Sequence, residues 1–159
     1  MPICVFDISE DGSATVPDTH SLTGPARYRW WHFDLSDPKL ADWCETNLPD
    51  IPAGALLQPE TRPRCDVFED GLILNLRGIN LNPGQPAEEM VSIRMWVTDD
   101  AVVTVRLRRV FAIEQIRQSA AAQMAPPTPA AFVTALVTRL TARVQEEVSA
   151  IAKLTEFFE

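Results

Sequence analysis

Few residues of this chain have side chains that could bind a metal ion, and they lie far apart. His20 and His32 are the only histidines; His20 lies in a polar stretch, and His32 follows two tryptophans in an aromatic run. A zinc site needs several histidine, thiolate or carboxylate ligands that converge on one point. The spacing therefore favours a solvated His20 and a packed His32 over a metal site.

Cys65 and Asp66, close to Glu69 and Asp70, form the one local group that combines a thiolate with carboxylates. Adjacent residues of a strand point to opposite faces, so Cys65 and Asp66 are poorly placed to share an ion. Acidic residues before Gly71 are also what a tight turn favours. We therefore name no metal ligand. The absence of nucleophile, zinc-protease and phosphate-loop motifs leads us to predict no catalytic residue, no required cofactor and no enzymatic activity.

One basic patch is expected, made by Arg94, Trp96, Arg106, Arg108 and Arg109. It could bind an anion, or it could meet acidic side chains of a covering helix, such as Glu146 and Glu147. We favour the second interpretation, because charges at the margins of a covered sheet commonly find partners there.

The composition is that of a folded, acidic protein: 46% of the residues are hydrophobic, 23% are charged, and the formal net charge is −8. Affinity for a phosphate backbone comes from clustered lysine and arginine, so this charge argues against a nucleic-acid partner. Cys4, Cys44 and Cys65 are widely spaced, which indicates reduced thiols. Because neither a secretory signal nor a run of about 18 apolar residues occurs, we expect these residues to lie in the cytoplasm.

Two hairpins are expected between residues 64 and 108, and the other elements are arranged around them. Asp70-Gly71 separates the apolar runs 64–68 and 72–77, which is the strongest short-range signal of a hairpin. Residues 91–97 and 103–108 alternate apolar and polar side chains around a turn at Asp99-Asp100. The alternation predicts an apolar face with Ile93, Met95, Val97, Val103, Val105 and Leu107, and a basic face with Arg94, Trp96, Thr104, Arg106 and Arg108.

The remaining elements predict the fold class. Strands are expected over 3–8, 14–16 and 27–34, and helices over 38–48, from 111 into the alanine-rich stretch before Pro126, and from 129 onward. Ser36 or Asp37 would cap the first helix, with Pro38 in its first turn, and residues 51–58 fit either a short helix or a loop. Hairpins mixed with amphipathic helices predict an α/β fold: a mixed parallel and antiparallel sheet covered by helices on both faces, an α/β/α sandwich that ends in a long helix.

The last helix carries an apolar stripe at three- and four-residue spacing: Val133, Val137, Leu140, Val144, Val148, Ile151, Leu154 and Phe158. Unbroken, it would have about 30 residues, a length at which a helix usually packs against a partner. No stop signal follows Phe157-Phe158, which favours a piece of a larger protein over fraying at a natural terminus.

Three runs of the sequence resemble a known family: residues 60–64, 71–84 and 90–96. They are similar to the amino-terminal cytoplasmic domain of the ZntB zinc transporters, within the CorA superfamily of divalent-cation transporters. The resemblance extends from the Trp30-Trp31 region to the last helix, and Leu-Arg-Gly-Ile-Asn-Leu-Asn-Pro-Gly, residues 76–84, is its most specific part.

The resemblance implies that residues 1–159 form a single cytoplasmic domain of such a transporter, whose transmembrane part is absent from this chain. It further implies an α/β/α domain that continues into a long stalk helix and two membrane helices, and a complete protein that forms a homopentamer in the inner membrane. The ion that is transported or sensed would be a divalent cation: zinc, with magnesium, nickel or cobalt as alternatives. The domain would act as a vestibule or regulator that couples cation occupancy to the pore through its C-terminal helices. The superfamily has a Gly-x-Asn signature at its pore. Gly78-Ile79-Asn80 has the same pattern, but it follows an expected strand and not a membrane segment. We therefore interpret it as the point where the chain leaves the strand and enters a loop.

Two other classes of function remain open from the sequence. One is an α/β domain that binds a small molecule or catalyses an unseen reaction, and it predicts a deep pocket with convergent titratable groups. The other is an interaction module that docks through Phe157-Phe158 and the apolar stripe.

Overall fold

The computed structural model describes residues 1–59, 62–80, 82–85 and 90–142. Within these ranges, one sheet has seven strands in the order β2-β1-β3-β7-β6-β5-β4. Their bounds are β1 Cys4–Ile8, β2 Ala14–Thr15, β3 Tyr28–Asp34, β4 Arg64–Phe68, β5 Gly71–Gly78, β6 Val91–Val97 and β7 Ala101–Arg106. β3 and β7 run parallel and the other neighbours are antiparallel, so the predicted mixed sheet is confirmed.

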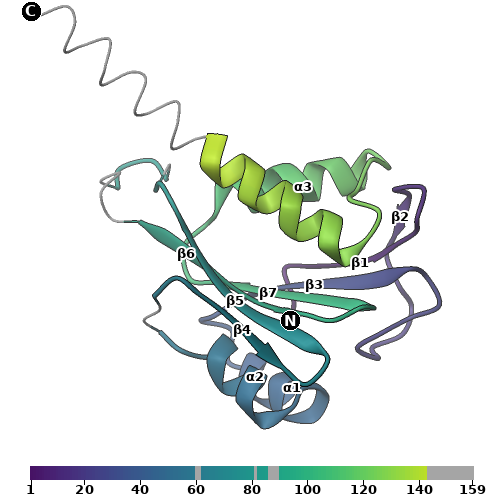
Figure 1. The fold of residues 1–159 in the computed structure, drawn as a ribbon, viewed down its shortest axis with the longest axis horizontal. Helices are drawn as coiled ribbons and strands as arrows, with labels where there is room; N and C mark the ends of the chain where they lie inside the picture. The colour runs from purple at the N-terminus through teal and green to yellow at the C-terminus, as the bar shows by residue number, and fades with distance from the viewer. Residues whose placement is uncertain (60–61, 81, 86–89, 143–159) are drawn as a thin grey trace, which may run out of the picture.

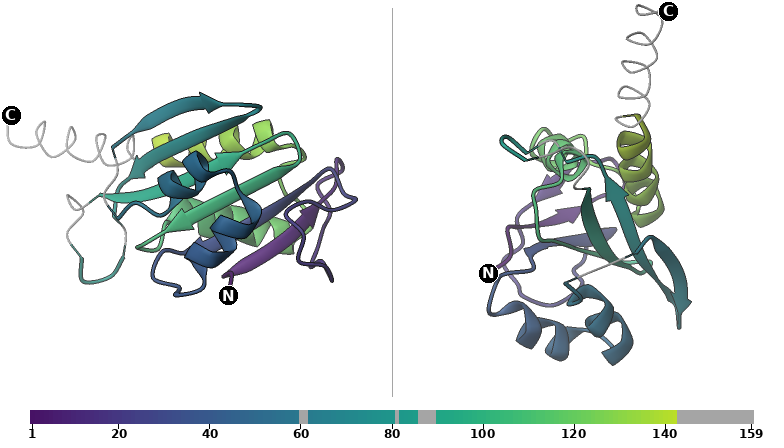
Figure 2. Two further views of the ribbon diagram at one scale, coloured as in Figure 1. Left: turned by 90° about the horizontal axis from the view of Figure 1, so that it is seen from below. Right: turned by 90° about the vertical axis from the view of Figure 1, so that its left-hand side faces the viewer.

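Helices cover both faces of the sheet, as predicted (Figure 1). α1 (Leu40–Asn47) and α2 (Asp50–Leu56) lie on one face; α3 (Phe111–Ala121) and a helix over 129–142, which we call the final helix, lie on the other (Figure 2). Two buried clusters hold the layers together, the first including Trp30, Met95, Ile113 and Phe132, the second including Trp31, Leu40, Leu56 and Trp96. The central strands β3, β6 and β7 are therefore buried on both faces, as expected of a sheet between two helical layers.

The first expected hairpin is confirmed, but its glycine has a different role. Phe68 pairs with Gly71, so Glu69 and Asp70 form the turn, and Glu69 has a φ of 52°. Gly71 is the first residue of β5 and lies against the indole of Trp96, where a side chain would collide with the ring. The turn therefore depends on the acidic residues, and the glycine makes room for a neighbouring side chain.

The second hairpin is present, but the predicted division into an apolar and a basic face is wrong. Val97 pairs with Val102, so Ile93 shares a face with Arg106, and Arg94 shares a face with Val105. The chain reverses over residues 98–101, where Thr98 N–H donates to Ala101 O. That loop is one residue shorter than the predicted pairing requires, and a shift of one residue moves every side chain of β7 to the other face. Both faces are buried here, and Leu107 is exposed.

The helices begin close to the capping residues that were predicted from the sequence. α1 begins at Leu40 with Lys39 at the N-cap, later than predicted, although Asp37 accepts a hydrogen bond from Lys39 N–H at 2.9 Å. α2 resolves the ambiguous stretch as a short helix. Thr128 caps the final helix as predicted, because its Oγ1 accepts a hydrogen bond from Ala131 N–H at 3.1 Å.

The final helix is attached to the sheet by a different set of side chains from the one predicted. Phe132 and Leu136 are fully buried, while Val133 and Leu140 pack against the same cluster. Val137 was predicted to belong to the buried stripe and is 41% exposed. The predicted stripe continues from Val144 to Phe158, and it lies outside the described residues together with Glu146, Glu147 and Phe157.

Candidate functional site

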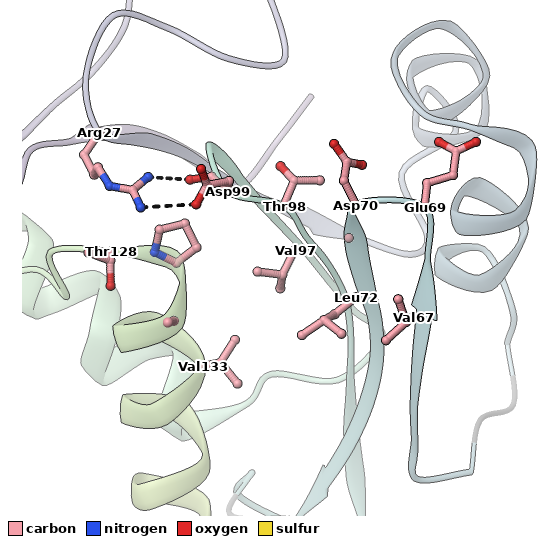
Figure 3. Close-up of a pocket in the computed structure, with 13 residues that line it drawn as sticks. Arg27, Val67, Glu69, Asp70, Leu72, Val97, Thr98, Asp99, Thr128 and Val133 are labelled. Atoms are coloured by element: carbon pink, nitrogen blue, oxygen red, sulfur yellow. Dashed lines mark hydrogen bonds and ion pairs between the residues drawn. The ribbon is translucent and has the colours of Figure 1, made fainter.

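An open hollow lies where two hairpin turns meet the start of the final helix (Figure 3). Its volume is about 660 Å³. The turn between β4 and β5 supplies Glu69 and Asp70, and the turn between β6 and β7 supplies Thr98 and Asp99. Figure 3 shows apolar side chains, among them Leu72, Val97 and Val133, below these polar residues. The hollow thus has an apolar floor and an acidic rim.

One arginine is paired with this acidic rim. Arg27 donates to the backbone carbonyl of Asp99, and its Nη2 lies 3.4 Å from Asp99 Oδ1. The Asp99 side chain is 98% exposed, so water weakens this ion pair. Arg27 and Asp99 are 72 residues apart in the chain, and the parallel pairing of Arg29 with Ala101 brings them together. Arg27 was not predicted as a site residue, because nothing near it in the sequence indicates that pairing.

The two histidines lie on opposite faces of the sheet. His20 is exposed and lines a second, apolar hollow of about 410 Å³ beside Trp31 and Phe33. His32 is 1% exposed, and its Nδ1 lies 2.7 Å from Thr104 Oγ1. Burial, with the positive charges of Arg106 and Arg117, lowers the pKa of His32 to about 3. His32 is therefore a neutral core residue, which agrees with the prediction of a packed side chain.

The cysteines also stand apart. Cys65 is exposed on the edge strand β4, Cys44 is buried in α1, and Cys4 is half-buried in β1. Burial raises the pKa of the Cys4 thiol to about 12 and that of the Cys44 thiol to about 11. Across the part of the chain that the structure describes, no three His, Cys, Asp or Glu side chains gather closely enough to hold a metal ion.

The predicted basic patch is divided between different surroundings. Arg106 Nη1 donates to Asp34 Oδ2 at 2.9 Å, and Arg109 Nη2 lies 3.8 Å from Glu114 Oε2. Arg94 is buried on the opposite face from Arg106. The partners predicted on a later helix, Glu146 and Glu147, are outside the described ranges. The register of β6 and β7 therefore divides the basic residues that the sequence suggested would share a face.

Gly78-Ile79-Asn80 lies at the exit of β5, as predicted. Asn80 is buried, and its Oδ1 accepts hydrogen bonds from the Asn82 backbone at 3.0 Å and the Asn82 side chain at 2.8 Å. Asn82 Nδ2 also donates to the backbone carbonyl of Arg109 at 3.1 Å. These bonds attach the loop after β5 to the segment before α3, which is a structural role.

Comparison with known proteins identifies the family. A family model described as "CorA-like Mg2+ transporter protein" matches residues 25–159, which is most of the chain. The chain belongs to the CorA-like family. The expectation drawn from residues 60–64, 71–84 and 90–96 is thereby confirmed, including the similarity to ZntB proteins.

Named relatives in this family are transport proteins. The divalent cation transporter CmaX of Pseudomonas aeruginosa is 34% identical over 131 residues, which cover 80% of this chain and 40% of CmaX. The zinc transport protein ZntB of Pectobacterium carotovorum is 30% identical over 143 residues, which cover 89% of this chain and 44% of that protein. This chain therefore spans less than half the length of these curated relatives.

The fold is shared with solved structures of CorA-like proteins. The cytoplasmic domain of ZntB from Vibrio parahaemolyticus matches with a TM-score of 0.86 and 28% identity, over 99% of this chain and 65% of that one. The full-length CmaX structure matches with a TM-score of 0.88 and 29% identity, over 98% of this chain and 50% of that one. In the described residues of our chain, no helix has both the length and the apolar character needed to cross a bilayer.

Proposed function

We propose that residues 1–159 form a single cytoplasmic domain of a divalent-cation transporter, of zinc type, whose transmembrane part lies outside this sequence. The observation that carries the proposal is the match of 99% of the chain to the cytoplasmic domain of a ZntB protein at a TM-score of 0.86. The complete protein would be a homopentamer in the inner membrane. Its cargo would be zinc, with magnesium, nickel or cobalt as alternatives.

We further propose that the final helix transmits cation occupancy from this domain to the pore. Phe132 and Leu136 of that helix are buried against the sheet, so a displacement of the sheet would move the helix with it. The two elements also meet at Gly78, where an ideal Cβ would lie 2.6 Å from Leu140 Cδ2. A glycine at this position lets the end of β5 approach the helix directly.

The acidic rim of the hollow supports a role in collecting cations. Glu69, Asp70 and Asp99 lie together at one end of the sheet, on a chain with a net charge of −8. Exposed carboxylates of this kind attract cations through their summed field, and salt screens that attraction. The rim would thus raise the local cation concentration without coordinating one ion.

The test uses the full-length protein in proteoliposomes that contain a zinc-sensitive dye. The proposal requires uptake of zinc or another divalent cation, and a full-length protein that carries none refutes the transporter assignment. A triple variant, Glu69→Gln, Asp70→Asn and Asp99→Asn, should slow uptake at low ionic strength and should match the wild type at high salt. A control with two exposed acids of α1 neutralised, Asp42→Asn and Glu45→Gln, should transport normally. Equal rates for both variants at low salt would refute the collecting role and leave the transporter assignment standing.

Calorimetric titration of residues 1–159 with zinc, nickel and magnesium tests the sensing role separately. If the domain senses cations, their addition should release heat or change its oligomeric state. No heat and no change in assembly would exclude sensing by this domain.

A further inference from the structure

Arg94 is a buried cation without an acidic partner among the residues that the structure describes. It is 1% exposed; its Nε donates to Gln58 O at 2.7 Å and its Nη2 to Pro59 O at 2.9 Å. Both acceptors are neutral backbone carbonyls. Its remaining nitrogen, Nη1, has no hydrogen-bond partner within the described ranges.

Arg29 is a second buried arginine, and its hydrogen-bond partners differ from those of Arg94. It is also 1% exposed, but its Nε and Nη2 donate to the two carboxylate oxygens of Asp7 at 2.6 and 3.0 Å. Its Nη1 donates to the carbonyls of Thr19 and Ser21 at 3.1 and 2.7 Å. Arg29 is therefore neutralised and fully bonded, whereas Arg94 is neither within the described part of the chain.

A buried charge that lacks a counterion is costly, and arginine cannot escape the cost by losing its proton. Burial lowers the pKa of Arg94 from its usual value, but a guanidinium remains charged in proteins. An anion that binds from outside the protein would lower this cost. The geometry thus suits a ligand of negative charge that can accept a hydrogen bond from Nη1.

A cavity is available beside this guanidinium. It has a volume of about 250 Å³ and is lined by Pro59, Met90, Ser92, Arg94, Leu107 and Arg108; we call it the Arg94 pocket. Ser92 and Arg94 are two residues apart on β6, so both side chains point to the same face of the sheet. The hydroxyl of Ser92 therefore accompanies Arg94 as a second hydrogen-bond donor in the pocket.

We propose that the Arg94 pocket binds the phosphate group of a small anion, with hydrogen-bond donors from Arg94 and Ser92. Planar guanidinium groups match the oxygen geometry of phosphate, and several donors around one site suit an anion with several acceptor oxygens. This proposal does not depend on the transporter assignment. Inorganic phosphate and a phosphate monoester share the required chemistry.

The first test is calorimetric titration of residues 1–159 with inorganic phosphate and with glycerol phosphate, at constant ionic strength in a buffer without phosphate. We expect one site per chain, and tighter binding of the monoester would identify an organic phosphate as the ligand. Arg94→Gln should weaken binding by about tenfold or more, because it removes charge-assisted hydrogen bonds. Ser92→Ala should weaken it by a few-fold. A matched control, Arg139→Gln, removes one positive charge from the final helix and should bind phosphate as the wild type does.

The second test uses the unmodified chain, since Arg94→Gln also removes the bonds to Gln58 and Pro59 and could unfold the protein. In a proton–nitrogen NMR spectrum, the side-chain Nε–H resonance of Arg94 should shift during the phosphate titration and saturate with the calorimetric affinity. Absence of binding at roughly millimolar phosphate, an unmoved Arg94 resonance, or equal binding of chloride would each overturn the proposal.

Discussion

Replacing Gly71 with alanine should destabilise the protein, although alanine is normally the better residue outside turns. Gly71 has no positive φ that would demand glycine, and it lies at the start of β5. An added Cβ would lie 2.7 and 2.8 Å from Cζ2 and Cζ3 of Trp96, and closer still to its Cη2. The indole is 2% exposed and is packed into the cluster beneath α1 and α2, so it has little room to move.

Two opposing effects decide the magnitude. Alanine would restrict the unfolded chain and so gain up to about 1 kcal/mol, whereas overpacking of a buried site costs about 1–3 kcal/mol. We therefore expect Gly71→Ala to lower the free energy of unfolding by about 1–2 kcal/mol, with overpacking as the larger effect. Urea denaturation followed by tryptophan fluorescence measures this, and at an m-value of roughly 1–3 kcal/mol/M the midpoint should fall by roughly 1 M.

The same substitution at Gly54 is the matched control. Gly54 lies in α2, and an added Cβ there would meet no heavy atom within 4 Å. Alanine should stabilise that helix by about 1 kcal/mol. In a Trp96→Leu background the cost of Gly71→Ala should disappear, giving an interaction energy of about 1–3 kcal/mol in the double-mutant cycle. A Gly71→Ala protein as stable as the wild type, or equal costs in both backgrounds, would refute the reasoning.

Three further predictions concern buried and exposed groups. His32 has a pKa of about 3 in the folded state and about 6.5 when unfolded. The free energy of unfolding should therefore fall as the pH drops below about 6.5, by up to about 1.4 kcal/mol per pH unit. In urea titrations between pH 6.5 and 5, the variant His32→Gln should show a smaller slope. Asp7→Asn leaves Arg29 buried without its carboxylate and should cost about 3–5 kcal/mol in the same assay. Cys65 is exposed, whereas the other two thiols have raised pKa values, so Ellman's reagent should modify one thiol rapidly in the native protein and none rapidly in Cys65→Ser.

Each of these three predictions would be contradicted by a specific result. A pH slope that His32→Gln leaves unchanged would mean that other groups cause the loss of stability. An Asp7→Asn protein within about 1 kcal/mol of the wild type would mean that the buried ion pair contributes little. Rapid reaction of two or three thiols would show that the cores around Cys4 or Cys44 open readily.

Local signals in the sequence predicted the elements well, because each depends on residues close together in the chain. The turn at Glu69-Asp70 and the cap at Thr128 are examples. The distribution of side chains between faces was less predictable. A four-residue loop, in place of a longer one, changed the register at Val97 and moved Arg106 to the face opposite Arg94. Alternating apolar and polar residues show which side chains of one strand share a face. The length of the turn decides which face of the next strand lies on the same side of the sheet.

The candidate site could not be predicted, because it depends on contacts between distant segments. Arg27 meets Asp99 through the pairing of β3 with β7, and Pro129 reaches the hollow through the packing of the final helix. The residues next to Arg27 and Pro129 in the sequence indicate neither of these contacts. The family, in contrast, was predictable from short runs such as residues 76–84, since they could be matched without knowing any distant contact.

The parallel pairing of β3 with β7 has a consequence for how the chain folds during synthesis. β3 leaves the ribosome early with Trp30, Trp31 and Phe33, yet the strand that pairs with it on one side follows some 72 residues later. Pairings so distant along a chain form slowly, and an unpaired aromatic strand is prone to aggregate meanwhile. A nascent chain released before Arg106 would therefore expose this edge, and we expect such truncated products to need chaperones that the complete chain does not.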